Sequence, residues 1–169
     1  MRRPLILLAL LATAAAAPPA GERLALPALP GLGIVHQQSA KGNSIEEQVP
    51  RGETIQQWTR MVTSLRFGGL ASQATPVAAL DRLATSVAGS CPGAVATPTR
   101  PLTVSGRPAA EMRADCPLNP QTGLPETFFA KAIAGASDLH MVQVAFRRVP
   151  SEADKAWAES ILRQVALTP

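Results

Sequence analysis

Hydrophobic residues recur at helical spacing in two segments of the chain, and this pattern predicts two amphipathic helices. The first begins with Thr75 as its N-cap and Pro76 at the first helical position, and Gly89 and Pro92 end it. The second is capped by Ser151, with an acidic residue three positions later. The helix positions that we expect to be buried against a sheet are Leu80, Leu83, Val87, Trp157, Ile161 and Val165.

Alternation with a period of two predicts strands over much of the remaining chain. Between residues 109 and 116, apolar side chains alternate with charged ones, as in a strand with one buried face. The strands expected from such patterns are 33–39, 44–49, 102–105, 109–116, 126–134 and 139–147, and residues 117–125 are expected to form a proline-rich loop. The chain is therefore predicted to have an α+β fold, with a twisted antiparallel sheet of about six strands and two main helices packed on it.

Residues 49–63 carry the densest set of local structure signals. Pro50 and Gly52 predict a turn, because proline fixes φ and glycine accepts positive φ. Thr54 is placed to cap a helical turn, with Gln57 three residues later to complete a capping box.

The residues that follow this turn fit two patterns. Ile55, Trp58, Val62 and Leu65 lie at helical spacing, whereas residues 59–67 alternate as in a strand. Because β-branched residues are concentrated after Trp58, we expect one helical turn followed by a strand.

The N-terminus has the composition of a secretory signal peptide. Arg2 and Arg3 precede a short apolar run and then small residues, and we place the cleavage after Ala16. The run is too short for a permanent membrane span. We therefore expect a signal peptide at 1–16, a flexible arm at 17–32 and a single α+β domain at 33–169.

The charge of the chain argues against nucleic acid as a partner. The formal net charge is +4, and it falls to about +2 when Arg2 and Arg3 leave with the signal peptide. No basic cluster with interleaved aromatic residues is present, and tyrosine is absent. The abundance of alanine, and of arginine over lysine, indicates a bacterial chain, so we expect a periplasmic or secreted protein.

The two cysteines, Cys91 and Cys116, are expected to form a structural disulfide. Export would place them in an oxidising compartment, where such bonds persist. Cys91 closes the first predicted helix, and Cys116 ends a strand on the face that this helix could cover. Their separation differs from the close spacing of a redox-active Cys-x-x-Cys pair.

Two other patterns could carry chemistry, but each has a structural explanation that we favour. Residues 89–93 have the glycine spacing of a nucleophile elbow around Cys91, but a helix precedes them where an elbow needs a strand. His36 and His140 are the only histidines, and neither has a partner at the spacing of a metal site. We expect His140 to be a core side chain on an apolar strand face.

The acidic residues near the 49–63 segment also have two explanations. Glu46, Glu47 and Glu53 could perform acid–base chemistry as buried pairs, but a solvated strand face is the commoner arrangement. Trp58 could stack on a ligand or fill the core, and the scarcity of aromatic residues favours the core. We therefore expect no catalytic residue, no metal ligand and no cofactor.

The order of the expected elements resembles the PsbP-like group of domains, which includes bacterial DcrB-like envelope proteins. The turn Val49-Pro50-Arg51-Gly52-Glu53 and the segment Trp58-Thr59-Arg60-Met61 contribute to this resemblance, which extends over residues 34–167. Residues 49–63 also resemble a motif in small secreted proteobacterial proteins of unknown function. The resemblance implies a non-catalytic binding or assembly factor. The candidate binding residues in the motif are Pro50, Gly52, Glu53, Trp58, Thr59 and Met61.

We therefore expect a non-catalytic domain that binds another envelope protein through a sheet face or through a groove beside residues 49–63. One alternative is a carrier of a small apolar ligand, held in a cavity lined by alanines between the sheet and the helices. The other is a small hydrolase. An enclosed pocket with convergent polar groups would favour an enzyme, and a shallow exposed apolar patch would favour protein binding.

The signal peptide gives the first testable prediction. We expect exported protein to begin at Ala17, because the small residues before this position suit signal peptidase. N-terminal sequencing of the exported protein tests this, and a sequence that begins at Met1 would contradict it.

Overall fold

The computed structural model describes residues 21–169. The expected signal peptide and the first residues of the expected arm, 17–20, lie outside the described residues. Within the described part of the chain, no helix has both the length and the apolar character needed to cross a membrane.

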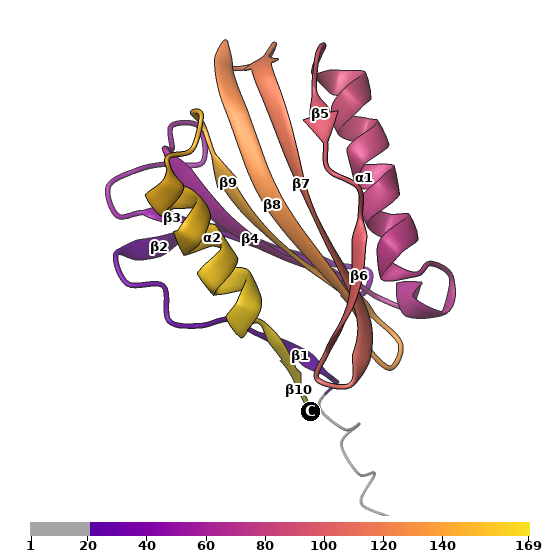
Figure 1. Ribbon diagram of the computed structural model, residues 1–169. Helices are drawn as coiled ribbons and strands as arrows, with labels where there is room; N and C mark the ends of the chain where they lie inside the picture. Colours follow the sequence, from indigo (N-terminus) through magenta and orange to yellow (C-terminus); the bar gives the residue numbers. More distant parts are fainter. Residues whose placement is uncertain (1–20) are drawn as a thin grey trace, which may run out of the picture.

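An eight-stranded antiparallel sheet forms the centre of the molecule (Figure 1). The order of the strands is β2-β3-β4-β9-β8-β7-β5, and β6 also pairs with β7. The strands are β2 (Leu32–Ala40), β3 (Asn43–Pro50), β4 (Arg60–Phe67), β5 (Val95–Ala96), β6 (Arg100–Val104), β7 (Arg107–Asn119), β8 (Leu124–Ala134) and β9 (Leu139–Phe146). The α+β class is confirmed. The strand count exceeds six: β4 and β6 lie where strands were expected, and the additional β5 pairs with the long β7.

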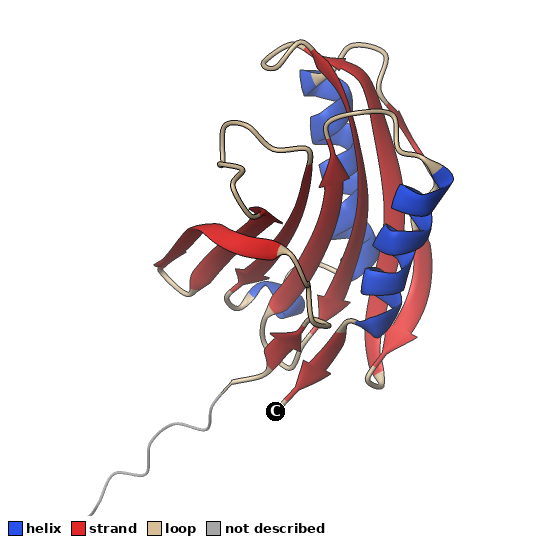
Figure 2. Ribbon diagram, turned by 90° about the vertical axis from the view of Figure 1, so that its left-hand side faces the viewer, coloured by secondary structure: helices blue, strands red, loops and turns tan. Residues whose placement is uncertain are grey.

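Two helices pack on opposite faces of this sheet, as Figures 1 and 2 show. α1 (Pro76–Ser90) lies over β7 and β8, and α2 (Glu152–Gln164) packs on the other face. Both predicted N-caps are present: Thr75 accepts a hydrogen bond from the first turn of α1, and Ser151 forms a capping box with Asp154. We refer to the two sides of the sheet as the α1 face and the α2 face.

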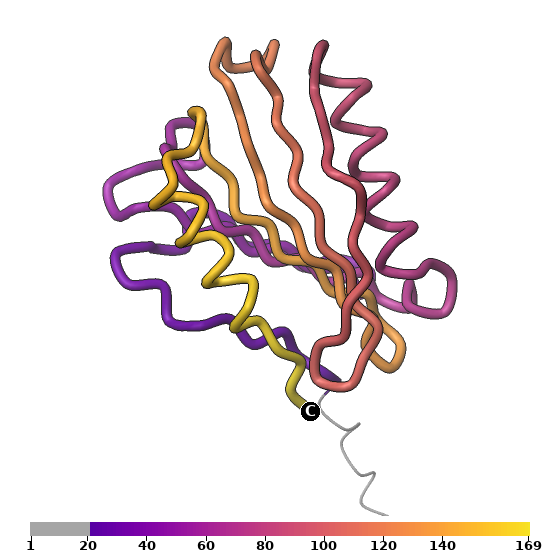
Figure 3. The backbone as a smooth tube through the Cα atoms, in the orientation of Figure 1, coloured from indigo at the N-terminus to yellow at the C-terminus, as the bar shows by residue number. Residues whose placement is uncertain are grey.

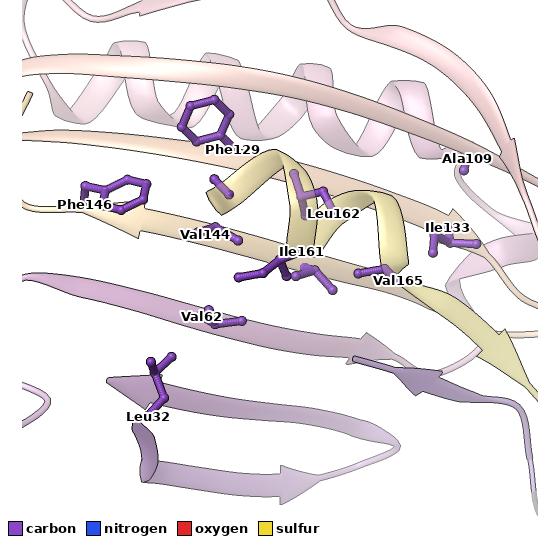
Figure 4. Packing of buried hydrophobic residues seen from close by; sticks show 12 residues of the cluster. Leu32, Val62, Ala109, Phe129, Ile133, Val144, Phe146, Ile161, Leu162 and Val165 are labelled. Atoms are coloured by element: carbon purple, nitrogen blue, oxygen red, sulfur yellow. The ribbon is translucent and has the colours of Figure 1, made fainter. Parts of the chain in front are cut away.

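The α2 face carries large side chains. Phe146 forms edge-to-face pairs with Phe129 and Trp157, with ring centroids 6.4 and 6.0 Å apart. Figure 4 shows Phe129 and Phe146 on the strands near Ile161 and Leu162 of α2. Burial of such side chains stabilises the fold by roughly 1.5–3 kcal/mol each.

The α1 face carries mainly small side chains along β7 and β8. Its fully or almost fully buried residues include Ala110, Ala114, Ala130 and Ala132. Leu80 is the fully buried leucine of α1 on this face. A row of alanines lets the helix approach the sheet closely where it lies above them.

The disulfide between Cys91 and Cys116 is present and joins the end of α1 to β7. The two Cα atoms are 5.9 Å apart, within the usual range for a disulfide. Because the bond closes a loop with a sequence separation of 25 residues, the chain-entropy model assigns it roughly 3–4 kcal/mol.

Three of the six helix positions expected to be buried are only partly buried. α1 lies toward the β7 edge of the sheet, so the flanks of its apolar stripe stay accessible. On α2, Trp157 contacts the guanidinium of Arg60, which lies 4.5 Å from the centroid of its ring. Leu80, Ile161 and Val165 are buried, whereas Leu83, Val87 and Trp157 are partly exposed.

The prediction of a loop at 117–125 is wrong for most of that segment. β7 continues to Asn119 and β8 begins at Leu124, with a register shift after Cys116. This irregularity places Pro117, which lacks an N–H, outside the regular ladder.

Residues 21–32 are packed, contrary to the expectation of a flexible arm. β1 (Arg23–Ala25) pairs with β10 (Ala166–Thr168), so the first described residues lie beside the C-terminus (Figure 3). Leu24, Leu26 and Leu29 pack against the α2-face core. Leucines without a regular spacing therefore extend the core, and the packed domain begins before residue 33.

A buried lysine connects α2 to the sheet. The Nζ of Lys131 on β8 donates a hydrogen bond to the carbonyl of Leu162, 2.5 Å away in the last turn of α2. It also lies 3.6 Å from a carboxylate oxygen of Glu111. Burial lowers the pKa of Lys131, and the Glu111 charge opposes this shift. A cation at a helix C-terminus is favourable, so this contact supports the position of α2.

His140 is buried on the α2 face, as predicted, and its Nε2 has no hydrogen-bond partner among the described residues. Burial lowers its pKa from 6.5. Asp138 and Glu22 favour the charged form, whereas Arg66 disfavours it.

We expect this histidine to make the protein less stable as the pH falls below about 6.5. The unfolded chain then binds a proton that the folded state resists, so the free energy of unfolding falls by up to about 1.4 kcal/mol per pH unit. Urea unfolding between pH 5 and 7.5 measures this slope, and His140→Phe should flatten it. If both proteins show the same slope, the pH dependence of the free energy of unfolding comes from groups other than His140.

Candidate functional site

Residues 51–59, here called the 51–59 loop, form a bend that is held by hydrogen bonds to the carboxylate of Glu53. Glu53 accepts hydrogen bonds from the N–H of Thr59 at 2.6 Å and from its hydroxyl at 2.7 Å. Thr54 accepts a hydrogen bond from the N–H of Gln57, as a cap would, but no helical turn follows. The predicted helical turn is absent: Thr54 and Gln57 exchange backbone hydrogen bonds in a tight bend, and the bonds to Glu53 bring the segment back toward β4.

Trp58 is a core residue with a cation on one side. Its side chain is 9% exposed and packs with Val49 and Met61 in the α1-face core. The guanidinium of Arg147 lies over its ring, 4.1 Å from the centroid. Such a contact contributes roughly 0.5–2 kcal/mol, depending on how far the cation is desolvated.

Arg147 is held in place without an ion pair among residues 21–169. Its Nη1 donates a hydrogen bond to the carbonyl of Gln56 at 2.6 Å, and its backbone N–H donates to the carbonyl of Thr59. Its Nε is buried and has no hydrogen-bond partner in this part of the chain. The guanidinium is therefore oriented by the loop while its charge stays available.

These residues line a surface groove of about 580 Å³, which we call the loop groove. The 51–59 loop forms one wall, and the tip of the β7–β8 hairpin forms the other through Gln121, Thr122 and Leu124. Leu124 is 47% exposed. The loop groove thus combines a cation, an exposed apolar side chain and neutral hydrogen-bonding groups.

The structure brings together four of the six candidate binding residues: Gly52, Glu53, Trp58 and Thr59 line the loop groove. Pro50 ends β3 outside its lining, and Met61 is buried in the core. Whether the four residues bind a partner stays a prediction.

Arg147 and the hairpin residues were not among the candidates. The alternation along residues 139–147 could have placed Arg147 on the face of Met141 and Ala145. No local pattern indicates that β9 ends beside Trp58, because the two residues are far apart in sequence.

The other candidate groups do not converge on the loop groove. His36 lies in β2 opposite Glu47, and His140 lies on the α2 face of β9. Glu46 accepts hydrogen bonds from two glutamines on the sheet surface. Cys91 is disulfide-bonded, so the elbow-like segment holds no free thiol. In residues 21–169, no three His, Cys, Asp or Glu side chains are grouped to hold a metal ion.

The sequence matches no family model and no curated protein. The fold is similar to the solution structure of cyanobacterial PsbP (CyanoP) from Synechocystis sp. PCC 6803. That similarity has a TM-score of 0.49 and 9% identity over 84% of this chain and 98% of that chain. A second similarity is to LpqN, involved in cell envelope biogenesis of Mycobacterium tuberculosis. Here the TM-score is 0.48, with 14% identity over 91% of this chain and 88% of that chain.

The first similarity is to the PsbP-like group that the sequence resembles. Both similarities are distant and concern the fold alone. Neither similarity identifies a function for this chain.

The two hydrogen bonds of Glu53 give a testable prediction. We expect Glu53→Ala to free the 51–59 loop and to destabilise the protein by about 1–3 kcal/mol, because hydrogen bonds to a charged acceptor are lost. Amide hydrogen exchange at Thr59 should accelerate. Glu53→Gln is the matched variant and should retain part of the protection. Unchanged exchange at Thr59 in Glu53→Ala would show that other contacts hold the loop.

Proposed function

We propose that this protein is a non-catalytic, extracytoplasmic binding domain that contacts another envelope protein through the loop groove. The observation that carries the proposal is the oriented guanidinium of Arg147 beside exposed Leu124. A polypeptide segment with an acidic group next to an apolar side chain matches this pair. Arginine and well-packed apolar anchors are typical of the residues that dominate protein interfaces.

The electrostatics of the loop groove favour binding over catalysis. Glu53 is the carboxylate that lines it, and both of its oxygens accept hydrogen bonds from Thr59. Each oxygen keeps a second lone pair, but the two hydrogen bonds hold the carboxylate to the 51–59 loop, so its structural role is to position that loop. The groove is also open to solvent, which suits an extended segment.

The location outside the cytoplasm is supported by the signal-peptide pattern and the disulfide. The proposed partner is therefore another protein of the envelope or of the secreted fraction.

Photocrosslinking in the native host tests this function. We expect benzoylphenylalanine at Gln121, on the wall of the loop groove, to give a discrete protein adduct. The same label at Glu159, which is exposed on α2, serves as the control. Adding Leu124→Asp should reduce the Gln121 adduct at least fivefold, because it places a carboxylate where an apolar anchor binds.

Two outcomes would overturn the proposal. One is the absence of an adduct at Gln121, and the other is an adduct of equal yield at Glu159 or in the presence of Leu124→Asp. Turnover on a panel of ester, peptide and glycan substrates, abolished by one substitution in the loop groove, would show that the protein is an enzyme.

A further inference from the structure

A second groove lies on the α1 face, between α1 and the strands β4 and β9. We call it the α1 groove, and its volume is about 370 Å³. Ala79 and Leu83 line it from α1, and Leu65 and Phe67 line it from β4. Buried Met141 of β9 also contributes to its lining.

Small side chains account for the open space. Ala79 stands in the first turn of α1 and Ala74 just before the N-cap Thr75, where larger residues would reach toward the sheet. Because α1 lies over β7 and β8, its N-terminal part leaves the same face of β4 and β9 uncovered beside it. The result is an apolar opening rather than a filled core.

One charged residue of the described chain lines the α1 groove. Arg82 is the charged residue that lines it, and this exposed side chain has no ion pair among residues 21–169. The other polar side chain of the lining, Gln143, contacts the sulfur of Met141 at 3.5 Å. The groove therefore offers an apolar surface with one cation at its margin.

We propose that the α1 groove binds a single-chain anionic amphiphile, with the alkyl chain against the leucines and the anionic headgroup at Arg82. Arg82 supplies the charge complementarity, and the volume falls within the range of small-molecule sites. A helix of 10–12 Å diameter fills roughly 400–600 Å³ per turn, so less than one turn would fit. An extended alkyl chain fits the same volume.

This site differs from the loop groove. Met141 lies near the start of β9 and Arg147 just after its end, and the two grooves share no lining residue. The amphiphile proposal does not depend on the proposed protein partner.

Isothermal titration with dodecanoate below its micelle concentration tests the site. We expect saturable 1:1 binding to the exported protein. Ala79→Phe should abolish it, because the ring occupies the α1 groove, and Ala74→Leu should weaken it. Urea unfolding of each variant confirms that the fold is retained. Failure to bind dodecanoate, or equal binding to correctly folded Ala79→Phe, would overturn the proposal.

The headgroup is tested separately. We expect Arg82→Gln to weaken dodecanoate binding about two- to fivefold, as for an exposed charge pair. Dodecyltrimethylammonium, which has the same chain and the opposite charge, should bind more weakly than dodecanoate. Arg163→Gln on the α2 face is the matched control and should bind as the unmodified protein does. Equal affinity for the two amphiphiles, or equal losses in the two arginine variants, would refute the role of Arg82.

Discussion

The packing of this protein depends on a difference in side-chain size between the two faces of β8 and β9. Phe129, Ile133, Val144 and Phe146 face α2, whereas Ala130 and Ala132 on β8 face α1. Because neighbouring residues of a strand point to opposite faces, one stretch of sequence sets both environments. The α2 side becomes a densely filled core stabilised by apolar burial.

The alanine-rich side has the opposite consequence. α1 approaches the sheet above β7 and β8, but its side chains do not fill the surface that continues over β9 and β4. Trp58 covers one end of that surface because the 51–59 loop folds over it. The other end stays open as the α1 groove, beside the small residues Ala74 and Ala79.

Much of this architecture could be predicted because its signals are local. Thr75 and Ser151 each cap a helix through a hydrogen bond from a residue three positions later. The alternation in β7 and β9 likewise follows from the strand geometry of neighbouring residues. The disulfide was predictable because only two cysteines exist and their elements were correctly identified.

The failures concern contacts between distant segments. β1 pairs three residues with β10, more than 140 positions away, and no periodicity accompanies so short a strand. The bent 51–59 loop depends on a side-chain carboxylate that competes with helix formation. Arg147 joins the loop groove through tertiary packing alone, so the sequence indicated one wall of that groove and not the other.

The width of the α1 groove is set by contacts outside its lining. The disulfide fixes the C-terminal end of α1, and Asp81 accepts a hydrogen bond from Thr99 at 2.6 Å in its middle. Before the helix, the short η1 segment (Leu70–Ser72) is preceded by Gly69, whose N–H donates a hydrogen bond to Asp138.

That hydrogen bond and the guanidinium of Arg66 lower the pKa of Asp138 from 3.8 to about 2. A depressed carboxyl pKa contributes stability that is present above the unfolded value and is lost as the pH falls toward the folded value. The hydrogen bond between Gly69 and Asp138 therefore persists at a pH between 5 and 6.5. In the same range the unfolded chain binds a proton at His140 that the folded state resists, which lowers the free energy of unfolding. His140 and Asp138 thus respond to acid in separate pH ranges, and mild acid weakens the fold through His140 before it protonates Asp138 and releases the contact with Gly69.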